Sequence, residues 1–140
     1  MKYDKNNIFA KILRDDLPSE RVYEDQYTLA IMDIMPRTKG HVLVIPKAPI
    51  RNMLDATPKY LLCCITTVKK VGQALIKTFN ADGLTVQQFN ETAGGQVIFH
   101  LHYHVLPRYK DKELTPYPSE VANISTIKEN AKKIRAVLDQ

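Results

Sequence analysis

Phe99-His100-Leu101-His102-Tyr103-His104-Val105-Leu106-Pro107 is the stretch on which the fold and chemistry of this chain depend. It holds three of the four histidines, each separated by one apolar residue. This period of two is that of a β-strand, so residues 100, 102 and 104 share one face of a sheet. On a helix the same spacing would spread the imidazoles over more than half of the circumference. The stretch therefore predicts a strand with a row of histidines on one side.

Three interpretations of this row are open from the residue types alone. A sheet surface that carries histidines by chance is the least favoured, because exposed faces usually carry Lys, Glu or Thr. A zinc site is the second interpretation, since alternating histidines on a strand can converge on one metal. The third is nucleophilic or acid–base catalysis, because neutral imidazole can act as nucleophile and general base at cell pH.

The residues on either side of the histidines favour the third interpretation. Upstream, Asn90-Glu91-Thr92-Ala93-Gly94-Gly95-Gln96 is a flexible loop whose backbone N–H groups could approach an anion. Downstream, Pro107-Arg108 ends the strand with a guanidinium. These residues resemble the histidine-triad nucleotide-binding proteins, whose signature alternates three histidines with apolar residues after a Gly-Gln pair. The resemblance covers about residues 6 to 108.

The resemblance implies a mechanism for the histidines. His102 would attack the α-phosphorus of a nucleotide, and water would then hydrolyse the nucleotidyl-imidazole intermediate. His104 would donate to a phosphate oxygen or to the leaving group, while His100 and His41 would orient the other two. No metal and no cofactor is required by this mechanism.

The resemblance also implies a nucleotide-binding pocket. Asp33 would accept hydrogen bonds from ribose hydroxyls, although an Asp at a strand end is also a common turn-former. Asn90 and the backbone N–H groups around Gly95, Gln96 and Val97 would contact the phosphates. The pocket for the base would be formed by apolar residues that could equally belong to the core: Ile8, Phe9 and Ile12, with Ile31 and Ile34 opposite.

The chain departs from its apparent relatives at three places. Many relatives carry a Cys pair that helps to bind a structural zinc, where this chain has Asn7 and Ala10. Val97 replaces a common Ser or Thr, so only its backbone N–H could reach a phosphate. Asn90 lies one residue closer to Gly95-Gln96 than the phosphate-contacting Asn of many relatives. These differences leave the histidine row intact.

The resemblance favours a purine nucleotide-binding enzyme that hydrolyses nucleoside 5′-phosphoramidates (AMP-amines). Two alternatives remain open: a dinucleoside polyphosphate hydrolase, and a regulatory nucleotide-binding module with little catalysis. Relatives of this type form homodimers, which implies a homodimer here. The 20 basic residues give a net charge of +5 without a basic cluster that alternates with aromatic residues, so nucleic acid is not an expected partner.

Composition indicates a single domain of 140 residues, with a core at about 6–108 and a C-terminal linker and helix at about 109–140. No apolar run approaches the roughly 20 residues needed to span a bilayer, so no membrane association is expected. The polar start, Met1 to Asn7, lacks the apolar centre of a signal peptide. Cys63 and Cys64 are adjacent and suit a reducing compartment. The expected location is cytoplasmic.

The resemblance implies an α+β fold like that of the histidine-triad family, with an antiparallel sheet of about five strands and one long helix packed on it. Apolar spacing predicts a short helix at 6–14 and a long helix from Thr57, its N-cap, to Phe79. Further strands are expected at 21–23, 28–33, 39–47 and 84–89 in addition to the histidine strand. A capping box at Thr126–Glu129 predicts the start of the C-terminal helix.

Overall fold

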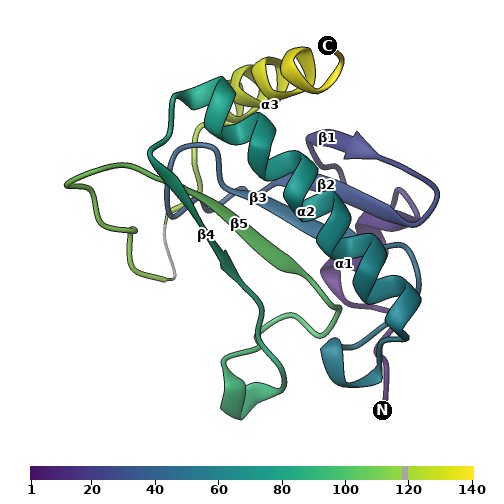
Figure 1. The fold of residues 1–140 in the computed structure, drawn as a ribbon. Coiled ribbons are helices and arrows are strands. Elements are labelled where there is room, and N and C mark those ends of the chain that lie inside the picture. The colour runs from purple at the N-terminus through teal and green to yellow at the C-terminus, as the bar shows by residue number, and fades with distance from the viewer. Residues whose placement is uncertain (118–119) are drawn as a thin grey trace.

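The computed structural model describes residues 1–117 and 120–140, so part of the predicted linker, at 118–119, lies outside the described residues. Five antiparallel strands form one sheet in the order β1-β2-β3-β5-β4, and three α-helices accompany it (Figure 1). The fold is α+β, as predicted. The helices and strands are α1 (Ile8–Leu13), β1 (Arg21–Glu24), β2 (Thr28–Met32), β3 (Val42–Pro46), α2 (Pro58–Phe79), β4 (Gly83–Gln87), β5 (Tyr103–Arg108) and α3 (Ile124–Leu138).

The central strands β2 and β3 are buried on both faces, which explains their uninterrupted apolar sequences. Alternate residues enter two separate core clusters, one on each side of the sheet. Ala30 and Val44 belong to the larger cluster, whereas Leu29 and Leu43 belong to the smaller one. The sheet is therefore the middle layer of the molecule.

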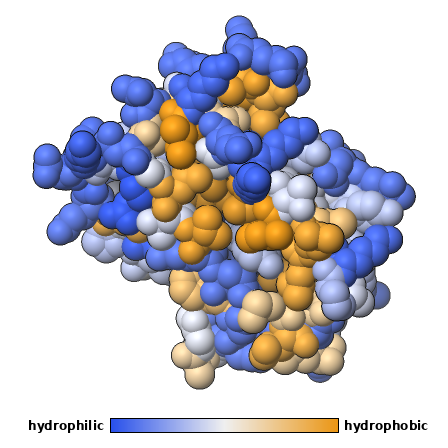
Figure 2. All heavy atoms as spheres, viewed as in Figure 1, coloured by the Kyte–Doolittle hydropathy of each residue, from blue (hydrophilic) through white to orange (hydrophobic). Residues whose placement is uncertain are grey.

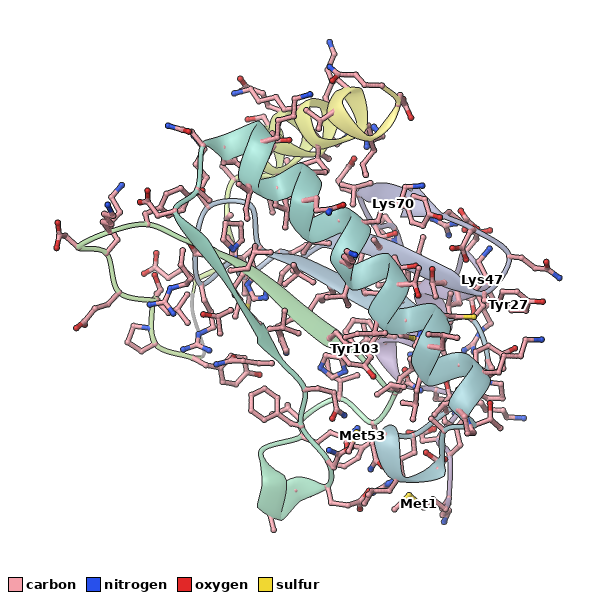
Figure 3. All side chains as sticks on the ribbon, in the orientation of Figure 1. Met1, Tyr27, Lys47, Met53, Lys70 and Tyr103 are labelled. Carbon is pink, nitrogen blue, oxygen red and sulfur yellow. The ribbon has the colours of Figure 1, made fainter. Side chains whose placement is uncertain are left out.

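Helices α2 and α3 cover the face of the larger cluster. Helix α2 begins as predicted, because the Thr57 side chain accepts from the Tyr60 N–H and Pro58 occupies the first turn. It ends at Asn80, whose left-handed conformation (φ 51°) terminates the helix. Tyr103, the first residue of β5, is labelled in Figure 3; its side chain belongs to this cluster and extends from β5 toward α2. The face that α2 covers is thus closed to ligands.

Helix α1 lies on the other face, behind the sheet in Figure 1. Asn7 is its N-cap, since its side-chain oxygen accepts from the Ala10 N–H at 2.9 Å. Phe9 and Ile12 pack with Leu29 and Ile45 in the smaller cluster. This cluster borders the histidines, because the Phe9 ring lies edge-on to both His100 and His102.

The histidine strand is shorter than predicted. Strand β5 begins at Tyr103, so of the triad only His104 belongs to it. His100 and Leu101 instead contact the chain at and after the end of β3. The Leu101 N–H donates to the Ile50 carbonyl, and the His100 ring nitrogen Nε2 is hydrogen-bonded to the Pro46 carbonyl. The predicted alternation is confirmed, because Leu101, like Tyr103, enters the core under α2 while the histidines face the other side.

The predicted start of the C-terminal helix is wrong by one turn. Helix α3 begins at Ile124, and its N-cap is Asn123, whose side chain accepts from the Ser125 N–H. Thr126 therefore lies inside the first turn instead of capping it. Within the described residues, no helix is both long and apolar enough to cross a lipid bilayer.

Candidate active site

His102 is held by the backbone of its own segment. Its Nδ1 lies 2.6 Å from the carbonyl oxygen of His100. A carbonyl oxygen can only accept, so Nδ1 carries the proton and Nε2 carries the lone pair. The side chain is buried, with 8% of the residue exposed, and the Phe9 ring lies 4.9 Å from its ring centre. This geometry leaves Nε2 as the nucleophilic atom of His102.

His41 and His104 form a second hydrogen-bonded unit. The backbone N–H of Arg37 donates to His41 Nδ1 at 3.1 Å, so the proton of the neutral ring lies on Nε2. His41 Nε2 then donates to His104 Nδ1 at 3.0 Å. This bond places the remaining ring proton of His104 on Nε2. His104 is consequently prepared to donate a proton from Nε2, and its ring centre lies 5.1 Å from that of His102.

His41 occupies its position because of the glycine before it. Gly40 has φ +87°, which side chains rarely adopt, and a Cβ there would lie 2.6 Å from the Phe79 ring. The chain can therefore turn tightly against the end of α2 before it enters β3. The Gly40-His41 sequence is explained by this close approach.

Burial keeps all four imidazoles neutral. It lowers the pKa of His41 to about 3, with the neighbouring His104 as a further cause. It lowers the pKa of His100 to about 4, although the Pro46 carbonyl opposes this shift. The pKa of His104 also falls to about 4, and burial lowers that of His102 as well. The lone pair on His102 Nε2 is therefore available at neutral pH.

Asp33 lies beside this unit, directly after β2. Its Oδ1 accepts from the Met35 N–H at 2.8 Å, which is the predicted turn-forming contact. Its Oδ2 lies 3.4 Å from His41 Nε2. Burial raises the pKa of this carboxyl to about 6, so it is mostly ionised at pH 7. Each oxygen keeps a lone pair that could accept from a sugar hydroxyl.

Asp33, His41 and His104 present ligand atoms within 4.8 Å of one another, a spacing that a metal ion could use. The hydrogen bonds of His41 do not fit this use. Since the Arg37 N–H occupies Nδ1, the proton lies on Nε2, the atom that would have to bind the metal. The three side chains fit a proton relay better than a metal centre.

The loop before the triad is closed by its own hydrogen bonds. The Gln96 side chain donates to the carbonyls of Arg51 and Ile98 and accepts from Glu91 N–H and Asn52. The N–H groups of Gly95 and Gln96 also donate inside the loop, to Thr92 and Glu91. These contacts correct the prediction that backbone N–H groups around 95–97 are all available to phosphate. In the described part of the chain, only Val97 N–H has no partner among the three.

The Asn90 side chain likewise makes most of its hydrogen bonds within the protein. Its side-chain oxygen accepts from the Met53 N–H and from Gln88, and its amide donates to the Gln88 oxygen at 2.8 Å. One amide proton is left for a phosphate.

Residues that the sequence did not single out fix the loop from outside. The Arg51 guanidinium makes a bidentate pair with Glu91, at 2.7 and 2.9 Å, and stacks over the Phe99 ring. Asn52 is fully buried and donates to both Glu91 and Gln96. No periodic pattern marks these residues, because they interact across 39 or more positions of sequence.

The predicted base pocket divides into core and surface residues. Phe9, Ile12 and Ile31 are buried in the smaller core cluster. Ile8 and Ile34 are 50% and 53% exposed, so they are the two that offer apolar surface to a ligand. Phe9, Ile12 and Ile31 are therefore core residues, which is the alternative that the sequence left open.

Comparison with known proteins agrees with this geometry. The family model described as the HIT domain matches residues 14–111. The Bacillus subtilis protein named Protein hit is 42% identical over 105 residues, which cover 75% of this chain and 72% of that protein. Adenylylsulfatase HINT3 of Arabidopsis thaliana is 35% identical over 101 residues, 72% of this chain and 51% of that protein.

A solved structure is also closely similar. It is that of a Hit-like protein involved in cell-cycle regulation from Bartonella henselae, with a TM-score of 0.91 and 50% sequence identity. The match covers 97% of this chain and 99% of that one. The chain described here belongs to the HIT (histidine-triad) family of nucleotide-binding hydrolases and transferases.

Proposed function

We propose that this chain is an enzyme that hydrolyses purine nucleoside 5′-phosphoramidates, with His102 as the nucleophile. The observation that carries the proposal is the bond from His102 Nδ1 to the His100 carbonyl, which leaves the lone pair on Nε2. An imidazole that attacks through Nε2 gains positive charge, and a hydrogen-bond acceptor at Nδ1 stabilises that charge.

The two steps balance with the groups at the site. In the first, His102 Nε2 forms a bond to the α-phosphorus, the phosphorus–nitrogen bond of the substrate breaks, and His104 Nε2–H protonates the departing amine. His104 is then an imidazolate that accepts from His41 at Nδ1, and in the second step its Nε2 takes a proton from water as the water oxygen attacks the phosphorus. The bond to His102 then breaks and the nucleoside monophosphate leaves. His41 holds His104 in the required tautomer in both steps.

The remaining site residues would bind the nucleotide. Asp33 accepts from the ribose hydroxyls, and the Val97 N–H and Asn90 contact the phosphate. Ile8 and Ile34 contact the base. Gly95 and Gln96 shape the loop through their internal bonds.

Acid quench during turnover of an adenosine phosphoramidate, followed by intact-protein mass spectrometry, tests this proposal. We expect a nucleotidyl adduct on His102. His102→Ala should lose the adduct and about a thousandfold or more of the rate while it still binds AMP. Bound nucleotide without an adduct in the parent would instead indicate a binding module.

Adenylyl sulfate is a second candidate substrate, because HINT3, one of the relatives, is named an adenylylsulfatase. The attack on phosphorus would be the same, but sulfate leaves without a proton whereas an amine needs one. His104→Ala should therefore slow the first step, departure of the leaving group, far more for a phosphoramidate than for adenylyl sulfate, whereas the second step, hydrolysis of the intermediate, is common to both substrates. Dinucleoside polyphosphates belong in the same comparison as a third substrate, whose leaving group is a nucleoside phosphate.

We further propose a homodimer that acts in the cytoplasm. Strand β4 lies at the edge of the sheet, and Figure 2 shows apolar atoms gathered around α2 on the face toward the viewer. The exposed apolar side chains there include Leu62, Ile65 and Val86. The free thiols of Cys63 and Cys64 support a reducing compartment. Light scattering of the parent and of Val86→Lys tests the dimer.

A further inference from the structure

The N-terminal segment contacts the candidate active site although no motif marks it. The Tyr3 hydroxyl lies 2.6 Å from His100 Nδ1, 97 residues away in sequence. The two rings also make a T-shaped contact, with their centres 5.7 Å apart. Tyr3 is therefore a fixed neighbour of the first histidine of the triad.

The direction of this hydrogen bond follows from the other side of the ring. His100 Nε2 lies 2.9 Å from the Pro46 carbonyl oxygen, which can only accept, so Nε2 carries the ring proton. Nδ1 then has only a lone pair, and the Tyr3 O–H must donate to it. Both nitrogens of His100 are thus occupied, and the ring is completely buried. His100 cannot itself transfer a proton to a substrate in this arrangement.

The fixed ring of His100 matters because of its carbonyl. That carbonyl oxygen accepts the proton of His102 Nδ1 and so decides which nitrogen of His102 is nucleophilic. The contacts of the His100 ring with Tyr3 and Pro46 hold residue 100 in place, and a shift of its backbone would move the carbonyl on which the orientation of His102 depends. The hydrogen bonds therefore run from Tyr3 through His100 to His102.

The same segment also reaches the loop before the triad, residues 90–96. Arg51, which pairs with Glu91 in that loop, donates from Nη1 to the Lys2 carbonyl at 3.1 Å. Its guanidinium stacks over Phe99, the neighbour of His100. In Figure 3, Met1 lies at the same end of the molecule as Met53, which follows Arg51 closely in sequence. Tyr3 thus contacts the histidine segment at His100, and Lys2 is connected through Arg51 to the loop at 90–96.

We propose that Tyr3 acts through His100 as a positioning residue for His102. We also propose that Lys2 and Tyr3 together connect the histidine segment, residues 100–104, to the loop at 90–96. The proposal rests on the proposed function insofar as His102 is the nucleophile. The hydrogen-bonded chain from Tyr3 to His102 is a property of the protein whatever its substrate.

The test compares Tyr3→Phe with Tyr23→Phe in the full-length protein. Both variants lose one hydroxyl, but that of Tyr23 donates to Asp25, beside β1. In ¹⁵N-labelled protein without ligand, we expect Tyr3→Phe to shift the His100 Nδ1 resonance and to speed exchange of the His102 Nδ1 proton with water. With an adenosine phosphoramidate, kcat should fall about tenfold, equivalent to about 1.4 kcal/mol, while KM changes less than twofold. Tyr23→Phe should match the parent in all of these measurements.

Unchanged exchange of the His102 proton in Tyr3→Phe would overturn the proposal, even if activity fell. A rise in KM with constant kcat would also overturn it, because that result assigns Tyr3 to substrate binding. If the parent does not turn over the phosphoramidate, the proposed function fails, but the nuclear magnetic resonance comparison still decides the role of Tyr3.

Discussion

Acidification should destabilise this protein steeply, because its four histidines are neutral when folded. The pKa is about 3 for His41 and about 4 for His100 and His104, and that of His102 is also lowered. In the unfolded chain each would return to about 6.5. Between these values the unfolded state binds more protons than the folded state. The free energy of unfolding is therefore fully maintained above about pH 6.5 and falls as the pH decreases below it.

Asp33 opposes this effect in part. Its pKa rises from about 3.8 to about 6 on folding, so between these values the folded state binds the extra proton. Near pH 5, unfolding then takes up about three to four protons on histidines and releases about one from Asp33. A net uptake of two to three protons corresponds to about 3 kcal/mol per pH unit. A domain with a stability of about 5–15 kcal/mol would unfold within a few pH units.

Urea unfolding at constant ionic strength between pH 7 and pH 4.5 measures this slope. His41→Asn is the matched variant, since it keeps a polar side chain but removes one titrating group. Its slope near pH 5 should be smaller by about 1 kcal/mol per pH unit. A parent stability that varies by less than about 1 kcal/mol from pH 6.5 to pH 5 would refute the reasoning, since the histidines would then be protonated in the folded state.

Three further predictions concern the ligand site. Asp33→Ala should remove the preference for AMP over deoxy-AMP, which we expect to be about tenfold to a hundredfold in the parent by calorimetry; equal binding by the parent would leave Asp33 a turn residue only. Because His41 Nε2 carries a proton, purified protein should contain substoichiometric zinc and keep its activity in EDTA, and loss of activity together with stoichiometric zinc would contradict this. Glu91 has φ 64° and ψ 164°, a region that favours glycine, so Glu91→Ala should lower Tm more than Glu91→Gly; equal values would show that the backbone there is unstrained.

Local patterns predicted most of the fold. The continuous apolar sequences of β2 and β3, the Thr57-Pro58 helix start and the alternation around the histidines are each decided by neighbouring residues, and each is observed. Several boundaries differ from the prediction: the first helix covers Ile8–Leu13 instead of 6–14, and β3 covers Val42–Pro46 instead of 39–47. Two further differences arise because other residues compete locally for the same hydrogen bonds. Asn123 supplies the cap that was assigned to Thr126, and the Ile50 carbonyl draws the Leu101 N–H away from the sheet.

The site was predicted less completely because much of it depends on distant contacts. The three histidines of the triad could be named from their spacing, and His41 from the resemblance to the histidine-triad family. Tyr3 and Arg51 could not, because their partners lie 97 and 40 positions away. The prediction that Gly95 and Gln96 N–H groups are free to bind phosphate failed for the same physical reason: backbone groups in a compact loop find partners within it.

The two hydrogen-bonded units differ in their acceptors, and this difference suits the proposed mechanism. His102 donates to a neutral carbonyl, which stabilises the positive charge of the nucleotidyl intermediate only moderately. A carboxylate in that place would stabilise the intermediate more strongly and slow its hydrolysis. The carboxylate of Asp33 lies instead beside His41, next to His104, the residue that must gain and lose a proton. The Asp33 carboxylate is thus close to the proposed proton transfers of His104. The neutral His100 carbonyl holds Nδ1 of His102, the ring nitrogen opposite the bond to phosphorus that must break again.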